Sequence, residues 1–208
     1  MAKGDWKTVG KIDVKTPGTV LGFDPSSTAY GICVIRDGEV HASQGDFSPG
    51  PDRWDRIYRM VRNITSACAD DGSLVCIAIE EMVAANASSA LYAGQVFGLS
   101  SLGIYHALDG NETTKAYAVP PNSMKKLVTG KGNCEKDQIL LALHKLYGLD
   151  CSECTNNEAD AVGLGLCALA VAGMLDVPTA RMLKEDKLRD LRAEPPTKVK
   201  KPRPLRSA

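Results

Sequence analysis

The sequence predicts one α/β domain in which a mixed β-sheet is flanked by helices. Two observations carry this prediction: β-rich apolar runs alternate with segments of helical periodicity, and two of the apolar runs end directly in an acidic residue. The length of 208 residues suits a single domain, and the shares of 44% hydrophobic and 24% charged residues are those of a globular protein. This composition argues against wholesale disorder, collagen and coiled coil.

The first half of the chain predicts an antiparallel start to the sheet. The apolar run 19–23 precedes Asp24, and Asp37-Gly38 joins the β-rich runs on either side of it as a hairpin. We expect three strands here, with 19–23 in the middle of the sheet. Residues 51–69 then place apolar side chains every three or four positions, which is typical of an amphipathic helix. Trp54 and Tyr58 belong to this apolar set, so we expect them in the core and not on a base-stacking platform.

The second half predicts parallel strands joined by helices, which completes a five-stranded sheet. The continuous apolar run that ends at Glu80 is typical of a buried parallel strand, and KAYAV at 115–119 is a further strand. Helices are expected at 86–109, which is rich in Ala, Ser and Gly, at 121–129 between a proline and a glycine, at 135–147, and at 158–175.

The two ends of the chain differ from its middle in composition. We interpret residues 1–18 as a flexible leader, 19–178 as the domain and 179–208 as a basic tail. Residues 181–208 hold ten Lys or Arg and four Asp or Glu, a net charge of +6; the whole chain balances at 25 each, so residues 1–180 carry −6. We expect a charged helix from about residue 180 and disorder from Pro195. Such a tail either binds phosphates without sequence preference or only solubilises the chain.

The cysteines and the hydropathy predict a cytoplasmic protein that is not bound to a membrane. Several of the seven cysteines lie inside apolar runs, as buried thiols of a reducing compartment do. No apolar run reaches the roughly 18 residues of a membrane span, and the first residues lack the apolar core of a secretory signal. Cys151 and Cys154 form a lone CxxC. Zinc would need Cys134 or His144 to join them, and free thiols are the favoured interpretation.

Three acidic residues carry the functional hypothesis. Asp24 and Glu80 each follow an apolar strand, at the end where α/β sheets bind ligands, and Asp160 lies at the start of an apolar helix. Each has a structural alternative: Asp24 as a turn residue, and Glu80 and Asp160 as helix-start acids, the latter behind an N-cap at Asn157. Asn157 shares a helix face with Asp160, whereas Glu158 would need a frayed helix start to reach it.

Hard oxygen ligands of this kind favour Mg²⁺, with Mn²⁺ as a substitute. Two ions about 4 Å apart can activate a water and stabilise a leaving 3′ oxygen in the hydrolysis of a phosphodiester. Asp24 would anchor both ions, and Glu80 and Asp160 would each complete one shell.

A basic segment follows the last predicted strand. Its four lysines fall within twelve residues and predict a flexible loop that contacts DNA phosphates, with a solvated helix face as the alternative: Lys125, Lys126, Lys131 and Lys136. Lys131 or Lys136 is the candidate for neutralising charge at the scissile phosphate.

Four segments, taken in order, resemble one known family. GFDPSSTAYG, IEE, PPNSMKKLVTGKGNCEK and NEADAVGLG are similar to the motifs of the RuvC-like Holliday-junction resolvases, which have the ribonuclease H-like, or retroviral integrase-type, fold. The resemblance covers about residues 19–175, and the phage-encoded branch looks most similar. It implies a dimeric, Mg²⁺-dependent endonuclease that cuts symmetric strands of branched DNA in a bacterial or phage-infected cell.

The resemblance carries over residue by residue. Asp24 matches the acid of the first strand, Glu80 the acid of the Ile-Glu pair, and Asp160 the acid of the last helix. The family often has an acid or histidine where this chain has Asn157, which offers a carbonyl oxygen but no charge; Glu158 could substitute. Basic positions of the family match Lys125 or Lys126, and Lys136. Val83 stands where some members carry a stacking aromatic residue.

Three other functions compete with a junction-cutting nuclease. An actin-like ATPase or sugar kinase would also bind phosphate after the first strand, but the chain lacks room for a second such domain. A non-catalytic junction-binding protein would bind without cutting. A relative that cuts RNA or flaps would share the same acids. The small residues of 86–109 suit either packing on the sheet or a symmetric dimer contact.

Overall fold

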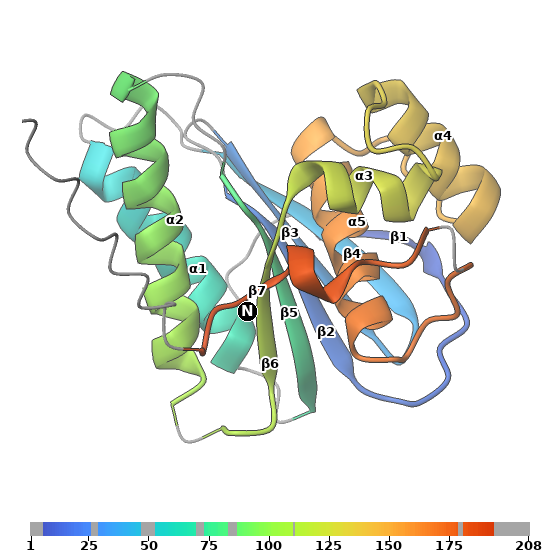
Figure 1. Cartoon of the computed structure of the whole chain (residues 1–208), viewed down its shortest axis with the longest axis horizontal. Helices are drawn as coiled ribbons and strands as arrows, with labels where there is room; N and C mark the ends of the chain where they lie inside the picture. Colours follow the sequence, from blue (N-terminus) through green and yellow to red (C-terminus); the bar gives the residue numbers. More distant parts are fainter. Residues whose placement is uncertain are drawn as a thin grey trace, which may run out of the picture.

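The computed structural model describes residues 6–25, 29–46, 53–69, 73–82, 87–109, 111–178 and 181–193. In these ranges a seven-stranded mixed sheet lies between two layers of helices (Figure 1). Helices α1 and α2 cover one face, and α5 covers the other with α3 and α4 packed beside it. The helices are α1 (Arg53–Ala69), α2 (Ala87–Ala107), α3 (Pro121–Thr129), α4 (Lys136–Tyr147) and α5 (Asn156–Val171).

The sheet has the strand order β1-β4-β3-β2-β5-β6-β7. Its strands are β1 (Lys7–Lys11), β2 (Thr19–Asp24), β3 (Ala29–Arg36), β4 (Glu39–Asp46), β5 (Leu74–Glu80), β6 (Lys115–Val119) and β7 (Arg189–Asp190). The five strands predicted from the sequence form its inner part, and β2 lies at the centre as expected. Because β2, β5 and β6 are parallel, Asp24 and Glu80 arrive at the same edge of the sheet.

The hairpin between β3 and β4 is confirmed. Asp37 and Gly38 both have positive φ values, of 50° and 86°, which is the conformation of a tight two-residue turn. Arg36 and Glu39 pair directly across it. The turn fixes the register of the two strands, since a slip by one residue would exchange their buried and exposed faces.

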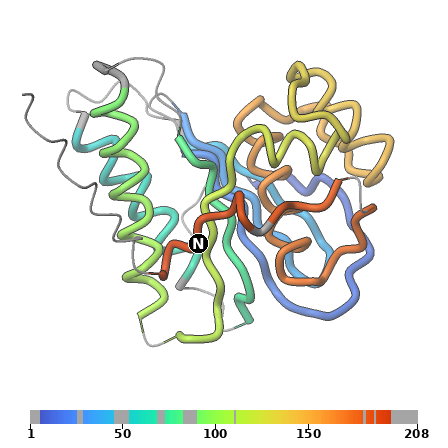
Figure 2. The backbone as a smooth tube through the Cα atoms, viewed as in Figure 1, coloured from blue at the N-terminus to red at the C-terminus, as the bar shows by residue number. Residues whose placement is uncertain are grey.

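The two edge strands lie in segments for which the sequence predicted no strand. The flexible leader is wrong for residues 7–11, which form β1 against β4 and bury Val9. The charged helix from residue 180 is also wrong: residues 181–193 contain no α-helix, but have 3₁₀ conformation at Arg181, the 3₁₀ turn Glu185–Lys187 and the short strand β7, paired with β6. Figure 2 shows this segment in red, running across to β6. The disorder expected from Pro195 falls outside the described residues.

Helix α1 buries a different set of side chains from the one expected. Ile57, Met60 and Ile64 are at most 2% exposed, whereas Trp54 and Tyr58 are 52% and 63% exposed. The prediction of a core role for these two aromatic residues is therefore wrong. The reason is that α1 packs on both the sheet and α2 through a stripe that begins at Ile57, so Trp54 in the first turn and Tyr58 in the second point outward.

Two further features that the sequence analysis considered are the cysteines and membrane-spanning segments. All seven cysteines are free thiols, and all but Cys154 are buried. Across the described ranges, no helix combines the length and the hydropathy that crossing a bilayer would need.

Helix α5 lies very close to β2 and β3 because two glycines leave room for it. A β-carbon at Gly22 would lie 2.2 Å from the carbonyl oxygen of Ala161, and one at Gly31 would lie 2.0 Å from that of Asn157. Neither distance is compatible with non-bonded contact, so any larger residue would push the helix away from the sheet. The two glycines therefore fix where the first turns of α5 lie.

We predict that Gly22→Ala or Gly31→Ala lowers the free energy of unfolding by about 3 kcal/mol, the upper part of the usual range for overpacking, because a backbone carbonyl must move. Chemical denaturation measures this. The control is Gly163→Ala on α5, whose new methyl group would have side-chain atoms of Met124 and Val128 as its nearest neighbours, and no backbone atom among the three nearest. Equal losses for all three variants would contradict the argument.

Candidate active site

The three acids predicted from the sequence lie together at one edge of the sheet. Asp24 ends β2 and Glu80 ends the neighbouring parallel strand β5, and their side chains are joined by a hydrogen bond. Asp160, in the second turn of α5, is near enough for its charge to act on Asp24 and for the charge of Glu80 to act on it. Three distant stretches of chain thus contribute one acid each.

This cluster is electrostatically unfavourable on its own. Asp24 is only 5% exposed, and burial, reinforced by Glu80 and Asp160, raises its pKa well above the usual range of an aspartate. Burial and then Glu80 raise the pKa of Asp160 to about 6. Crowded carboxylates resist ionisation unless positive charge lies between them, so the site has the charge distribution of a cation site.

The donor set fits a hard divalent cation that is shared with a substrate. Among the described residues, no three His, Cys, Asp or Glu side chains lie close enough to surround one ion as they stand. Mg²⁺ does not require this, because it usually takes one or two carboxylates and completes its octahedron with water and phosphate oxygens. Asp24 and Glu80 can supply such a pair, with Asp160 facing them from α5.

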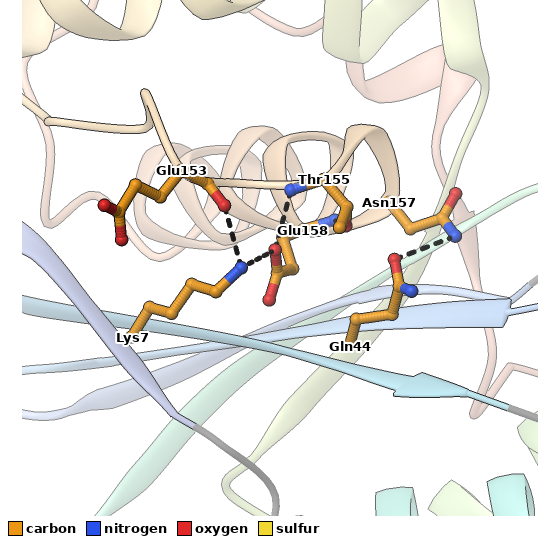
Figure 3. Close-up of polar contacts among 6 residues, drawn as sticks. All are labelled: Lys7, Gln44, Glu153, Thr155, Asn157 and Glu158. Atoms are coloured by element: carbon orange, nitrogen blue, oxygen red, sulfur yellow. Dashed lines mark hydrogen bonds and ion pairs between the residues drawn. The ribbon is translucent and has the colours of Figure 1, made fainter.

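Glu158 does not join the acids, contrary to one expectation. It accepts a hydrogen bond from the Thr155 backbone N–H at 2.7 Å and pairs with Lys7 Nζ at 2.8 Å (Figure 3). Thr155 in turn accepts from the Glu158 N–H, which makes a capping box. Thr155 is therefore the N-cap of α5, so the assignment of Asn157 to that position is wrong. Glu158 is 2% exposed and engaged in holding the helix start.

Asn157 is tied to the sheet by its side-chain nitrogen. This nitrogen donates to the Ala29 carbonyl at 3.1 Å and, at 3.5 Å, to the Gln44 side-chain oxygen (Figure 3). Ala29 begins β3, which runs antiparallel to β2 and so starts at the edge where Asp24 ends. The amide oxygen of Asn157 is the group that remains for a cation.

Sequence reasoning missed Lys7 and Gln44 altogether. Lys7 bridges β1 to the start of α5, because its ammonium group also donates to the Glu153 carbonyl at 2.8 Å. No signal marked it, since it lies in a polar segment interpreted as a leader. The capping box did have a signal: the spacing of Thr155 and Glu158 is that of the S/T-x-x-E pattern.

Two of the four predicted lysines lie at the acids. Lys136, the first residue of α4, lowers the pKa of both Asp24 and Asp160 against the effect of burial, and Lys125 on α3 acts on Asp160. Lys125 also donates to the Cys134 carbonyl at 3.2 Å, which links α3 to the loop before α4.

The other two lysines point elsewhere. Lys126 lines a hollow that α3 shares with the C-terminal segment, and Lys131 lines another with Gln138 and Lys145 of α4. Of the two candidates for charge neutralisation, Lys136 is thus the one that the structure places at the acid cluster.

The CxxC sequence forms a turn with two adjacent thiols. The Cys154 backbone N–H donates to the Cys151 carbonyl at 3.0 Å. A hydrogen bond between the two side chains raises the pKa of Cys151 and lowers that of Cys154. In the described part of the chain no third histidine, cysteine or acid joins them at metal-binding distance. Both residues are free thiols in the structure.

Comparison with known sequences identifies one family. The family model of crossover junction endodeoxyribonuclease RuvC matches residues 20–168. A protein of that name from Anaeromyxobacter sp. is 30% identical over 167 residues, which cover 77% of this chain and 78% of the relative. Another, from Pelodictyon phaeoclathratiforme, is 31% identical over 166 residues, which cover 74% and 81%.

Comparison with solved structures supports the same fold. The structure of T. thermophilus RuvC in complex with a Holliday junction substrate has a TM-score of 0.63 at 20% identity. A second Thermus thermophilus RuvC structure has a TM-score of 0.60 at 21% identity. Each covers 83% of this chain and 99% of the other. The sheet and its helices therefore have the ribonuclease H-like fold that the sequence resemblance implied.

We predict that the acid cluster destabilises the metal-free chain at neutral pH. An aspartate whose folded pKa is about 6, against 3.8 in the unfolded chain, binds more protons when folded, so stability is lost as the pH rises from about 4 to 6. In EDTA, Asp160→Asn should therefore gain about 2 kcal/mol over wild type between pH 4 and pH 7. Denaturant titrations measure the difference.

The matched control is Asp109→Asn, an exposed aspartate beyond the end of α2. It should follow the wild-type pH dependence. Millimolar Mg²⁺ should raise the free energy of unfolding of the wild type at pH 7. It should raise that of Asp160→Asn by less. A gain that is the same at both pH values would contradict the electrostatic explanation.

Proposed function

The chain belongs to the RuvC family of crossover junction endodeoxyribonucleases, and we propose that it hydrolyses phosphodiester bonds at the crossover of four-way DNA junctions with Mg²⁺ bound by its acid cluster. The observation that carries this proposal is the meeting of Asp24, Glu80 and Asp160 at one sheet edge with Lys136 beside them. The family match gives no support to the actin-like ATPase alternative.

The reaction requires a water to attack phosphorus in line with the departing 3′ oxygen. Divalent cations, when bound, supply an activated water and stabilise the negative charge on the leaving oxygen. Asp24 interacts with both other acids, so it would hold the two ions in common, while Glu80 and Asp160 would each complete one shell. The hydrogen bond between Asp24 and Glu80 requires one of the two carboxyl groups to be protonated, so a bound ion would replace that proton.

Lys136 and Lys125 would serve the substrate and not the ions. Each lies on the α3–α4 side of Asp160, and an ammonium group there can bind a phosphate oxygen as charge builds up during attack. Such a group needs no rearrangement at the moment of reaction, so most of its contribution comes from being placed in advance. Lys125 is already held in place by the Cys134 carbonyl.

We predict that Asp24→Asn and Glu80→Gln each lower the rate of junction cutting at least about a hundredfold, as loss of a transition-state contact does, while junction binding is retained. A synthetic four-way junction with labelled strands measures both, in Mg²⁺ and in EDTA. Wild type should give symmetric paired nicks in Mg²⁺ only.

The control is Glu81→Gln, one residue beyond Glu80. The Glu81 carboxylate pairs with Arg189 at 3.8 Å and is not among the groups that act on Asp24 or Asp160. This variant should cut at nearly the wild-type rate. Junction binding by wild type without Mg²⁺-dependent cutting would instead favour the non-catalytic alternative.

We infer that two copies of the chain associate through α2. Its outer face carries Leu91, Leu102 and Tyr105, which are 68%, 61% and 57% exposed. Gly94 and Gly98 lie between them, and no described atom lies within 4 Å of a β-carbon built on either. An apolar helix face with small residues at its centre allows a second helix to approach closely, and a two-fold axis there would present two sites to one junction.

We predict that Leu102→Glu converts the dimer to a monomer and abolishes paired nicking. Sedimentation velocity at micromolar concentration measures the mass, and the junction assay distinguishes paired from single nicks. Leu141→Glu on α4 is the control, because Leu141 is similarly exposed, at 51%, on another helix. A wild-type chain that sediments as a monomer would contradict the inference.

A further inference from the structure

A basic hollow lies outside the acid cluster. It has a volume of about 400 Å³ and is formed between α3 and residues 182–187. Three lysines line it, Lys126 from α3 and Lys184 and Lys187 from the C-terminal segment, together with the polar residues Asn122 and Ser123. The apolar residues Met182 and Leu183 also line it, and every charged residue in its described lining is a lysine.

The hollow opens at the same edge of the sheet as the acids. Val119, the last residue of β6, pairs in register with Glu80, and Pro120, the next residue, lines the hollow. The neighbouring lysines of α3 divide between the two places: Lys125 acts on Asp160, and Lys126 lines the hollow. Helix α3 therefore separates the acid cluster from a second, positively charged surface.

The segment that supplies two of these lysines is held in place by the sheet. β7 pairs with β6, and the guanidinium group of Arg192 donates to the Thr114 carbonyl at 2.9 Å. Arg189 pairs with Glu81 and lies 4.8 Å from the centre of the Phe97 ring. Lys184 and Lys187 are consequently presented on a fixed support. The segment lies beyond residues 20–168, which the family model matches.

We propose that Lys126, Lys184 and Lys187 form a contact site for the phosphate backbone of the duplex arm next to the cut strand. The inference rests on the proposed function, since it concerns the same DNA. Ammonium groups bind phosphates as point charges and set the register of a protein on DNA without reading its sequence. The acid cluster repels the same backbone, so a positive surface one helix away holds the DNA where the cluster alone would not.

The test measures how junction binding depends on salt. Binding of the full-length chain to a synthetic four-way junction is titrated at several salt concentrations. EDTA is present throughout, because it removes divalent cations and so prevents cutting. Each lost phosphate contact reduces the slope of log K against log salt by about 0.9, so Lys184→Gln with Lys187→Gln should reduce it by about two. Affinity at about 0.1 M salt should fall roughly tenfold or more. Lys126→Gln, which leaves the segment untouched, should reduce the slope by about one.

The control is Lys11→Gln with Lys115→Gln, which removes the same charge from the opposite edge of the sheet. Lys11 is the last residue of β1 and the register partner of Glu39, and Lys115 is the first residue of β6. This variant should keep the wild-type slope. Thermal unfolding of each variant checks that the chain is folded, and the Lys126→Gln variant tests the hollow even if the segment variant is destabilised.

The outcomes separate this proposal from the proposed function. If wild type binds and cuts the junction but the hollow variants keep its slope, the contact site is wrong and the nuclease stands. If only the segment variant loses slope, the segment binds DNA without the shared hollow, which also overturns the proposal. If wild type neither binds nor cuts the junction, the proposed function itself fails.

Discussion

At Gly22 and Gly31 no side chain fits between α5 and the strands that it crosses, and the position of Asp160 depends on that close approach. Gly22 and Asp24 are two residues apart on β2, so they share one face of the sheet, and Gly31 is the register partner of Asp24 on β3. The backbone of α5 lies directly over these glycines. The absence of a side chain at residue 22 thus brings the helix down to the level where the next side chain on that face, Asp24, can meet Asp160.

The start of α5 needs support because the acids beside it repel one another. The capping box of Thr155 and Glu158 satisfies backbone groups of the first turn, and Lys7 neutralises the buried carboxylate of Glu158. An unpaired charge at 2% exposure would be costly, so the ion pair makes the capping acid tolerable there. The edge strand β1 therefore does more than extend the sheet: it anchors the helix that carries Asp160.

Local patterns in the sequence were sufficient for most of the fold, and non-local pairing explains the rest. The apolar runs before Asp24 and Glu80, the Asp37-Gly38 turn and the proline and glycine that bound α3 all act within a few residues, so they can be recognised without the tertiary structure. β1 and β7 exist only because distant strands offer them hydrogen bonds, and neither has an alternating apolar pattern that would announce it.

The candidate site likewise contains residues that local patterns reveal and residues whose positions depend on tertiary packing. The acids could be identified because each directly follows or begins an apolar element. The separate directions of Lys125 and Lys126, in contrast, depend on how α3 is rotated against α5 and on a segment that joins from sixty residues downstream. Glu158 illustrates a signal that was present but overlooked, since its spacing from Thr155 already indicated a capping role.

The distribution of charge gives the C-terminal segment a physical role in a chain of no net charge. Residues 1–180 carry a net −6, and three of their acids are gathered where a polyanion must approach. A surface of this charge does not attract DNA, so under the proposed function the attraction would come from positive groups near the site, since exposed charges are screened beyond about 10 Å at 0.1 M salt. The pairing of β7 with β6 and the bond from Arg192 to the Thr114 carbonyl tie the segment to the sheet. These contacts thereby set the spacing between the acids, which would act on one phosphate, and the lysines, which would hold its neighbours.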